Sequence, residues 1–277
     1  MSYPEVYHDI SILLLPEALS ELKKASAPQL EEISPVEKYL PQLLTAATER
    51  LKSRGLGVEE KEFQEVFRYG ITSIARAYAE GDWRFYAFFS ELFTKISIID
   101  SLYEWSINIA SLPPRATFFE VNTVAPVYLS RLSQRVSGSP GIITEKRFLY
   151  NSTFKEIYDE YSRRYDLKLN VVPLEDADRL ASLNGTVDVL VFATLDAMSL
   201  GWRTILGMAS SLLKKGGTLI AIVPDNKREG LRSLLRAWRI PDYEPPETLA
   251  TNLQDSRFTK IRYSTKGPFS AFVAQKR

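Results

Sequence analysis

The sequence predicts an α/β fold, a doubly wound and mostly parallel seven-stranded sheet, preceded by an all-helical N-terminal domain. From Ala116 onward, short apolar runs alternate with helical segments, a pattern typical of parallel βαβ units. Residues 1–112 instead carry apolar side chains at helical spacing. The pair Pro113–Pro114 separates the two regimes, because consecutive prolines stop helices. We therefore expect a helical domain over 1–112 and the sheet domain over 113–277.

The N-terminal half is punctuated by prolines and contains one unusually aromatic helix. Ser34 followed by Pro35 is typical of a helix start, with proline at the first helical position. Residues 82–109 place phenylalanine, isoleucine and tyrosine side chains on one stripe and further aromatic residues outside it. A helix this apolar is expected to be a central core helix. Lining a pocket between the two halves is the alternative.

The sheet domain is predicted element by element. Five strands are expected at residues 116–121, 141–146, 167–172, 187–193 and 216–224. Helices are expected between and after them at residues 126–136, 152–165, 202–215 and 226–240. Two closing strands, 258–264 and 269–275, flank a turn at residues 266–268. So short a turn cannot make a parallel crossover, and the last pair is predicted to be antiparallel.

Composition excludes several chemistries. The chain has no cysteine and one histidine, His8, which rules out disulfides, thiolate nucleophiles, histidine-based triads and multi-histidine metal sites. The net charge of +1 gives no global attraction to nucleic acid or membranes. The first residues do not read as a signal peptide and no apolar stretch is long enough to span a bilayer, so a cytoplasmic protein is expected. Many charged and aromatic residues without cysteine would suit a thermophile.

A more specific pattern lies in the second half of the sheet domain. A strand begins with Asp188, the next helix runs into Leu-Lys-Lys-Gly-Gly at residues 213–217, and an apolar strand follows. This order resembles the class I S-adenosylmethionine-dependent methyltransferases over roughly residues 115–277. Gly216 is expected to supply the left-handed turn that ends the helix.

The resemblance is weakest at the cofactor loop. The family carries an acidic residue and three glycines after its first strand; here the acid is Glu120, and Asn122, Val124 and Pro126 replace the glycines. Asparagine tolerates a left-handed backbone, valine does so only at a cost, and proline lacks an N–H. A divergent or abandoned cofactor site is therefore expected nearly as readily as a working one.

Other family positions imply further S-adenosylmethionine contacts. Glu145 lies at the end of the second strand, where the family's acid holds the ribose hydroxyls. Asp176 or its neighbour Glu175 follows the third, where an acid meets the adenine amino group. Thr194 follows the fourth, in a segment ending at Asp196 that would face the reacting methyl group. The alternative for each acid is a helix cap or a solvated loop residue.

A basic helix is predicted after the fifth strand. Arg228, Arg232 and Arg236 recur every four residues, and Arg239 joins the same side. This spacing suits contacts with an anion or a nucleic acid. The plainer alternative is the solvated face of a sheet-covering helix.

The sequence therefore predicts an S-adenosylmethionine-dependent transferase, with methyl transfer to an unidentified small-molecule or macromolecular acceptor. A catalytically inactive methyltransferase-like scaffold that binds protein or nucleic acid is the main alternative. The layout also loosely resembles nicotianamine synthases, which transfer an aminocarboxypropyl group; Glu91 would then be a pocket acid. The family motif for exocyclic amines is absent after the fourth strand. No catalytic residue is assigned, no metal or membrane is expected, and the aromatic half could form a homodimer surface.

Overall fold

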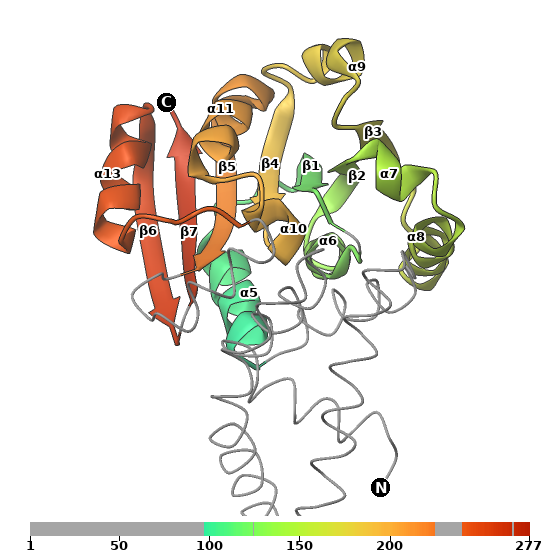
Figure 1. Ribbon diagram of the computed structural model, residues 1–277, viewed down its shortest axis with the longest axis horizontal. Coiled ribbons are helices and arrows are strands. Elements are labelled where there is room, and N and C mark those ends of the chain that lie inside the picture. Colours follow the sequence, from blue (N-terminus) through green and yellow to red (C-terminus); the bar gives the residue numbers. More distant parts are fainter. Residues whose placement is uncertain (1–96, 124, 225–239, 268) are drawn as a thin grey trace, which may run out of the picture.

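The computed structural model describes residues 97–123, 125–224, 240–267 and 269–277, drawn in colour in Figure 1. The first 96 residues therefore lie outside the described part, with most of the predicted helical domain, His8 and Glu91. So do Val124 and the four arginines of the predicted basic helix. The expectations that depend on these residues remain predictions.

A single seven-stranded sheet forms the centre of the described part. Its strands are β1 (Arg115–Val121), β2 (Ser137–Thr144), β3 (Asn170–Pro173), β4 (Val187–Phe192), β5 (Leu213–Pro224), β6 (Phe258–Lys266) and β7 (Phe269–Lys276). Their order across the sheet is β3-β2-β1-β4-β5-β7-β6. The first five pair in parallel, and β7 pairs antiparallel with both β5 and β6. The predicted doubly wound sheet with a closing antiparallel pair is confirmed.

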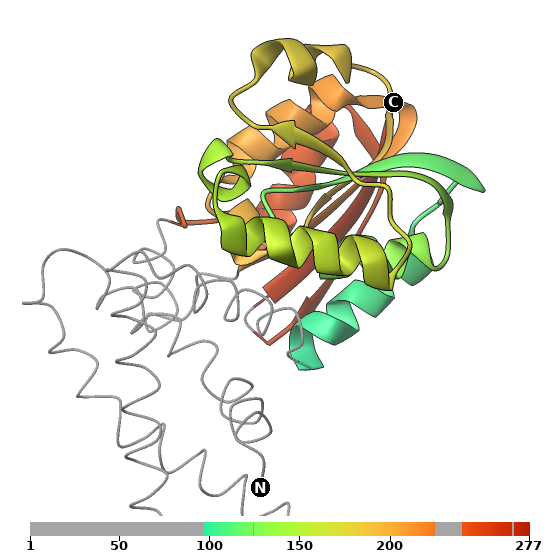
Figure 2. The ribbon, with the colours of Figure 1, turned by 90° about the vertical axis from the view of Figure 1, so that its right-hand side faces the viewer.

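Helices cover both faces of this sheet. They are α5 (Ser97–Ile109), α6 (Val127–Ser133), α7 (Lys146–Leu149), α8 (Ser152–Arg164), α9 (Ala177–Ser182), α10 (Leu195–Met198), α11 (Trp202–Leu212) and α13 (Pro246–Asp255). Figure 2 shows α5 and α6 on one side of the strands and α11 on the other. In Figure 1, α13 lies at the β6 end of the sheet and α8 lies at the β3 end.

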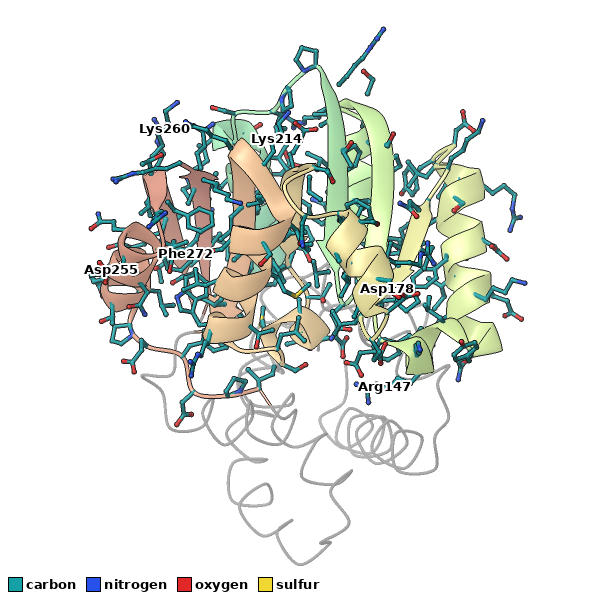
Figure 3. All side chains as sticks on the ribbon, turned by 90° about the horizontal axis from the view of Figure 1, so that it is seen from above. Arg147, Asp178, Lys214, Asp255, Lys260 and Phe272 are labelled. Atoms are coloured by element: carbon teal, nitrogen blue, oxygen red, sulfur yellow. The ribbon has the colours of Figure 1, made fainter. Side chains whose placement is uncertain are left out.

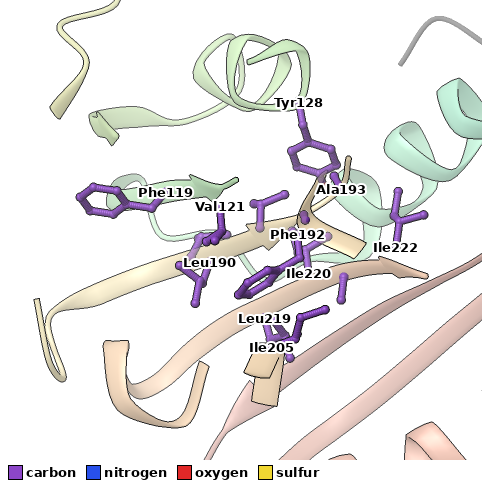
Figure 4. Close-up of a cluster of buried hydrophobic side chains, with 14 of the residues drawn as sticks. Phe119, Val121, Tyr128, Leu190, Phe192, Ala193, Ile205, Leu219, Ile220 and Ile222 are labelled. Atoms are coloured by element: carbon purple, nitrogen blue, oxygen red, sulfur yellow. The ribbon is translucent and has the colours of Figure 1, made fainter. Parts of the chain in front are cut away.

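The core forms because the central strands are apolar on both faces. Every residue of β4 is buried, and so are the last eight residues of β5. Strands covered on both sides read as continuous apolar runs, which is how the sequence identified them. Figure 4 shows Tyr128 of α6 on one side of these strands and Ile205 of α11 on the other. Both side chains are completely buried.

The junction between α11 and β5 differs from the prediction. The helix ends at Leu212, and Leu213 is already extended and pairs with Val187 of β4. Gly216 has the expected positive φ of 78°. It lies, however, within β5, between Leu213, which pairs with Val187, and Thr218, which pairs with Val189. The expectation that Gly216 ends the helix is wrong, because burying Leu213 against β4 stops the helix earlier.

The aromatic helix expected over 82–109 is described from residue 97 onward as α5. It packs against β6 and β7, and Ile99, Leu102 and Tyr103 are fully buried in the core of the sheet domain. The Tyr103 hydroxyl donates a hydrogen bond of 2.9 Å to the carbonyl of Ala193, just after β4. The end of the predicted helical domain is thus joined to the sheet; the boundary at residue 112 remains a prediction.

Candidate functional site

The candidate site lies where β1, β2 and β4 end, at the carboxyl edge of the parallel strands. After β1 the chain crosses through α6 to β2, whereas after β4 it crosses through α11 to β5 on the other side. Ligands of open α/β sheets bind at such a reversal of strand order. Asn122, Glu145 and Thr194 each follow one of these three strands.

Asn122 is the residue that connects the three strand ends at this edge. It is completely buried and has a φ of 51°, the left-handed region that asparagine tolerates better than most residues. Its side-chain Nδ2 donates to Glu145 Oε1 at 3.1 Å and to the carbonyl of Asp196 at 2.8 Å. Its backbone N–H donates to the carbonyl of Ile143 at 2.6 Å, which extends the β1–β2 pairing by one residue. Asn122 therefore links the ends of all three strands.

The amide of Asn122 has one unused atom. Both of its Nδ2 partners are acceptors, so the nitrogen must face them and Oδ1 must point elsewhere. Oδ1 is buried and has no hydrogen-bond partner. Buried acceptors are usually paired, so this oxygen is a natural place for a donor from a ligand.

Glu145 follows β2 and precedes α7. Its side chain is 23% exposed, and its Oε2 pairs with Arg147 Nε at 2.6 Å. Its Oε1 accepts from Asn122 and, at 3.1 Å, from a terminal nitrogen of Arg147. A carboxylate has about four acceptor positions, so these contacts leave room for a ligand hydroxyl. Its predicted cofactor contact therefore remains sterically and chemically reasonable.

Glu120 is turned away from the open edge. It is fully buried, and Oε2 accepts the backbone N–H of Leu129 in α6 at 3.0 Å. Its other oxygen, Oε1, has no partner. Burial raises the pKa of Glu120 from 4.5 to about 8, even though the hydrogen bond from Leu129 lowers it. Glu120, the acid of the predicted cofactor loop, thus binds the backbone of α6 and is largely protonated at neutral pH.

Thr194 and Asp196 occupy the end of β4. The Thr194 hydroxyl donates to the carbonyl of Asn122 at 3.0 Å and accepts the N–H of Ala197, capping α10. Asp196, in the first turn of α10, is only 4% exposed. The structure therefore brings Thr194, predicted as a cofactor contact, directly against Asn122.

The two acids after β3 cap helices. Asp176 accepts the N–H of Arg179 at 3.1 Å and begins α9. Glu175 is exposed, and its two oxygens accept the N–H of Lys146 in α7. These contacts match the helix-cap alternative for both residues. The role of Asp176 toward adenine remains a prediction.

Three buried tyrosines support the loops of this edge; the sequence placed Tyr103 on the stripe of the aromatic helix and gave no role to Tyr158 or Tyr243. Tyr158 of α8 donates to the carbonyl of Thr123 at 2.7 Å, and Tyr243 donates to the carbonyl of Met198 at 2.7 Å. Tyr103 of α5 holds Ala193. Burial raises the pKa of each phenol above its usual value, so each hydroxyl keeps the proton it donates. The stripe spacing indicated a core position for Tyr103, and the partners of all three tyrosines become visible only in the fold.

The loop after β1 contains a backbone hydrogen bond between its own residues. The N–H of Val127 donates to the carbonyl of Ala125 at 2.8 Å, and Pro126 has no N–H to offer. Thr123 and Ala125 are both buried. A glycine-rich loop leaves such amides open to a ligand, so any ligand here must rely more on side chains.

Two open cavities lined by described residues lie at the other edge of the sheet. Their volumes are about 370 and 500 Å³, and both are lined by Asp188. Figure 3 shows Lys214, which lines the larger one, at the edge opposite Arg147, the partner of Glu145. These cavities are therefore separate from the candidate site.

No group of three or more histidine, aspartate or glutamate side chains that could hold a metal ion occurs within the described ranges. Among the helices that can be described, none is long and apolar enough to cross a membrane.

Solved structures supply the matches to known proteins. No family model matches the chain, and no curated protein sequence does. A CurJ carbon methyltransferase structure matches with a TM-score of 0.53 and 15% identity, covering 91% of this chain and 70% of that one. An O-methyltransferase family protein from Burkholderia thailandensis gives 0.48 and 16%, covering 77% of this chain and 62% of that one. Geranyl diphosphate C-methyltransferase from Streptomyces coelicolor, solved with S-adenosyl-L-homocysteine, gives 0.48 and 11%, covering 64% and 79%.

The CurJ match and the strand order together identify the fold. The order β3-β2-β1-β4-β5-β7-β6 with an antiparallel β7 is the sheet that the resemblance predicted. The described part of the chain has the class I methyltransferase fold. At 15% identity the match concerns the fold alone.

Proposed function

We propose that the chain is an S-adenosylmethionine-dependent transferase whose cofactor binds at the carboxyl edge of β1, β2 and β4. The observation that supports this best is Glu145, which stays partly exposed at the end of β2 while Asn122 and Arg147 fix its carboxylate. The bound cofactor supplies an electrophilic carbon next to a sulfonium. The protein's own task is to hold the cofactor, exclude water and take up the acceptor's proton.

Glu145 is proposed to accept hydrogen bonds from the ribose hydroxyls. Arg147 occupies one side of the carboxylate, and its own side chain is 46% exposed. An ion pair this exposed is weak, so part of it can give way to a ligand. Thr194 keeps the β4 loop against Asn122, so both walls of the site are held in place before binding.

Asp196 is proposed to receive a proton from the acceptor. It is the first carboxylate after β4, in the segment that the resemblance places next to the reacting methyl group. The chain has no cysteine, and His8, its one histidine, lies outside the described residues. A carboxylate is the base that remains in this segment. Asp196→Asn should lower turnover while leaving cofactor affinity within about threefold.

The proposal is tested by calorimetric titration of the full chain with S-adenosylmethionine and S-adenosylhomocysteine. Wild type should bind both ligands, and Glu145→Ala should weaken binding by about 10- to 100-fold, because a hydrogen bond to a charged group is lost. Glu156→Ala, at an exposed position on α8, is the matched control and should bind like wild type. Absence of binding by wild-type protein at high concentration would overturn the proposal.

The transferred group is identified from the product left after turnover. Methyl transfer leaves S-adenosylhomocysteine, whereas aminocarboxypropyl transfer, the layout-based alternative, leaves methylthioadenosine. Mass spectrometry of protein incubated with S-adenosylmethionine and fractionated small-molecule acceptors separates the two. We propose methyl transfer and therefore expect S-adenosylhomocysteine.

A non-catalytic scaffold is the second candidate. It is favoured by the loop after β1, where Thr123 and Ala125 are packed as interior and the N–H of Val127 is bound to the carbonyl of Ala125. A scaffold would bind neither S-adenosylmethionine nor S-adenosylhomocysteine, so the same titration distinguishes it from a transferase. If it binds nucleic acid through the predicted basic helix, Arg232→Glu with Arg236→Glu should abolish the gel shift; unchanged binding would exclude that surface.

A further inference from the structure

We propose that Asn122 replaces the missing loop glycines as a positioning residue: its side-chain amide aims Glu145 and joins the ends of β1, β2 and β4 into one rigid edge. The inference rests on the proposed cofactor site, because it assigns the residue that gives this site its shape. It also predicts that restoring the family's glycine at this position harms the site.

The backbone at Asn122 has a conformation that glycine adopts freely. Its φ of 51° belongs to the left-handed region, where glycine is free and asparagine is the best tolerated alternative. The turn therefore survives the replacement. What the asparagine adds is a side chain inside the turn, and that side chain is completely buried.

The side chain fixes Glu145 from the protein side. Oε1 of Glu145 receives Nδ2 of Asn122 at 3.1 Å, while Oε2 receives Nε of Arg147 at 2.6 Å. The asparagine is buried, whereas the arginine is about half exposed and lies over the ring of Phe148. Without the amide, the carboxylate would be held only by the exposed partner. Its orientation toward the site would then be lost.

The same amide fixes the end of β4. Nδ2 also donates to the carbonyl of Asp196 at 2.8 Å, and the Thr194 hydroxyl returns a hydrogen bond to the carbonyl of Asn122. On the opposite side, the backbone N–H of Asn122 reaches Ile143 in β2. Glycine would keep the two contacts made by the backbone and lose the two made by the side chain. Only the asparagine couples Glu145 directly to the β4 loop.

The remaining amide oxygen of Asn122 is an unused hydrogen-bond acceptor that a ligand could fill. Oδ1 is buried and has no partner in the protein. With Nδ2 fixed by two acceptors, the amide cannot turn over to satisfy it. A ligand hydroxyl or amino group that donates to Oδ1 would complete the set.

The decisive variant is Asn122→Gly, compared with wild type by titration with S-adenosylhomocysteine. Glycine adopts the same backbone without strain, so the variant should fold, which far-UV circular dichroism verifies. We expect affinity at least tenfold weaker, although the family's own residue has been restored. Equal or tighter binding would show that backbone access, rather than the amide, limits the site, and would overturn the inference. Asn184→Gly, in an exposed loop before β4, is the matched control and should bind like wild type.

A second variant separates orientation from side-chain volume. Asn122→Asp keeps the shape and tolerates the left-handed backbone, but places a second carboxylate against Glu145 in place of a donor. Binding should fall at least as far as in Asn122→Gly and should recover partly as pH is lowered, when one carboxyl takes up a proton. Wild-type affinity for this variant would contradict the role assigned to the amide.

A cofactor-independent measurement keeps the inference separate from the proposed function. In a double-mutant cycle of Asn122→Gly and Glu145→Ala, urea unfolding should show that the two changes are not additive, with a coupling of at least threefold in the unfolding constant. Additive effects would overturn the inference whatever the cofactor does. If wild type binds neither ligand but the coupling is present, the proposed function fails and the positioning contact stands.

Discussion

Two carboxylates are buried at opposite ends of the parallel strands, and they are satisfied very differently. Asp188, at the start of β4, accepts the N–H of Thr117 at 2.8 Å and forms an ion pair with Lys214. Glu120, at the end of β1, receives one backbone N–H from Leu129 and keeps an unpaired oxygen. A buried carboxyl without a cation is costly in its ionised form, so Glu120 holds its proton.

This difference predicts a pH dependence. Because the folded pKa of Glu120 is raised to about 8, the folded state keeps a proton that the unfolded state releases above about pH 4.5. Stability therefore falls as pH rises from about 5 to 8, by at most about 5 kcal/mol from this group. Glu120→Gln should flatten that decline, as measured by urea unfolding at each pH. The same slope in wild type and variant would contradict the assignment; Glu156→Gln, on the surface of α8, is the control.

The ion pair at the other edge predicts an asymmetry. Asp188→Ala removes a buried acceptor and leaves the Thr117 N–H without its partner, which should cost about 1–3 kcal/mol. Lys214→Ala should cost less than about 1 kcal/mol, because its side chain is 47% exposed and water from the adjoining cavities can reach Asp188. Denaturant unfolding of both variants checks the ranking, and a costlier Lys214→Ala would refute it.

At the scale of elements, strand β2 depends on close approach to its neighbours. A Cβ at Gly141 would lie 2.2 Å from the ring of Phe119 in β1 and 2.7 Å from the carbonyl oxygen of Asn170 in β3. No side chain fits there unless the sheet moves. The glycine therefore permits the pairing on both sides of β2.

Two alanine substitutions should consequently act in opposite directions. Gly141→Ala should destabilise the protein by about 1–3 kcal/mol through overpacking. Gly207→Ala, on the exposed side of α11 where a Cβ meets nothing within 4 Å, should stabilise it by about 0.5–1 kcal/mol. Thermal unfolding measures both, and a stabilising Gly141→Ala would contradict the packing of β2.

Most long elements were predictable and the shortest were not, and the ten-residue helix α13 was also not predicted. The strands at residues 116–121 and 187–193 match β1 and β4 to within one residue at each end, because fully buried strands are continuous apolar runs. Helices α7, α9 and α10 have only four to six residues, too few for a helical period to show, and were not predicted. These short helices follow β2, β3 and β4, so the N–H partners of Glu175, Asp176 and Thr194 emerged only from the fold, although a helix cap was already the alternative for the two acids.

At the scale of the whole molecule, helix α5 precedes the sheet in sequence but belongs to its core. Leu102 is fully buried, and the neighbouring Tyr103 contacts the ring of Tyr128 in α6 at a centroid distance of 4.9 Å. Arg131 of α6 lies over the Tyr103 ring and pairs with Asp100 of α5. The α5–α6 contact therefore supports the layer directly beneath the loop after β1.

Removing a buried side chain of α5 should destabilise the entire sheet domain. Leu102→Ala should reduce the free energy of unfolding by about 2–5 kcal/mol, as for other fully buried leucines. Asn108→Ala, on the outer side of the same helix, removes an exposed hydrogen bond from Arg135 and should change it by less than about 1 kcal/mol. Urea unfolding followed by tryptophan fluorescence measures both, and equal effects would mean that α5 is not part of the cooperative core.

The sequence by itself determined the sheet, its antiparallel closing pair and the positions of Asn122, Glu145 and Thr194 at strand ends. These follow from local apolar patterning and from the spacing of single residues along the chain. Only the tertiary structure decided that Asn122 joins three strands, that Glu120 faces α6 and that tyrosines from three segments hold the loops. Such contacts join residues 9 to 90 positions apart. Their geometry depends on how the strands are ordered and how the helices cover them, which no local pattern encodes.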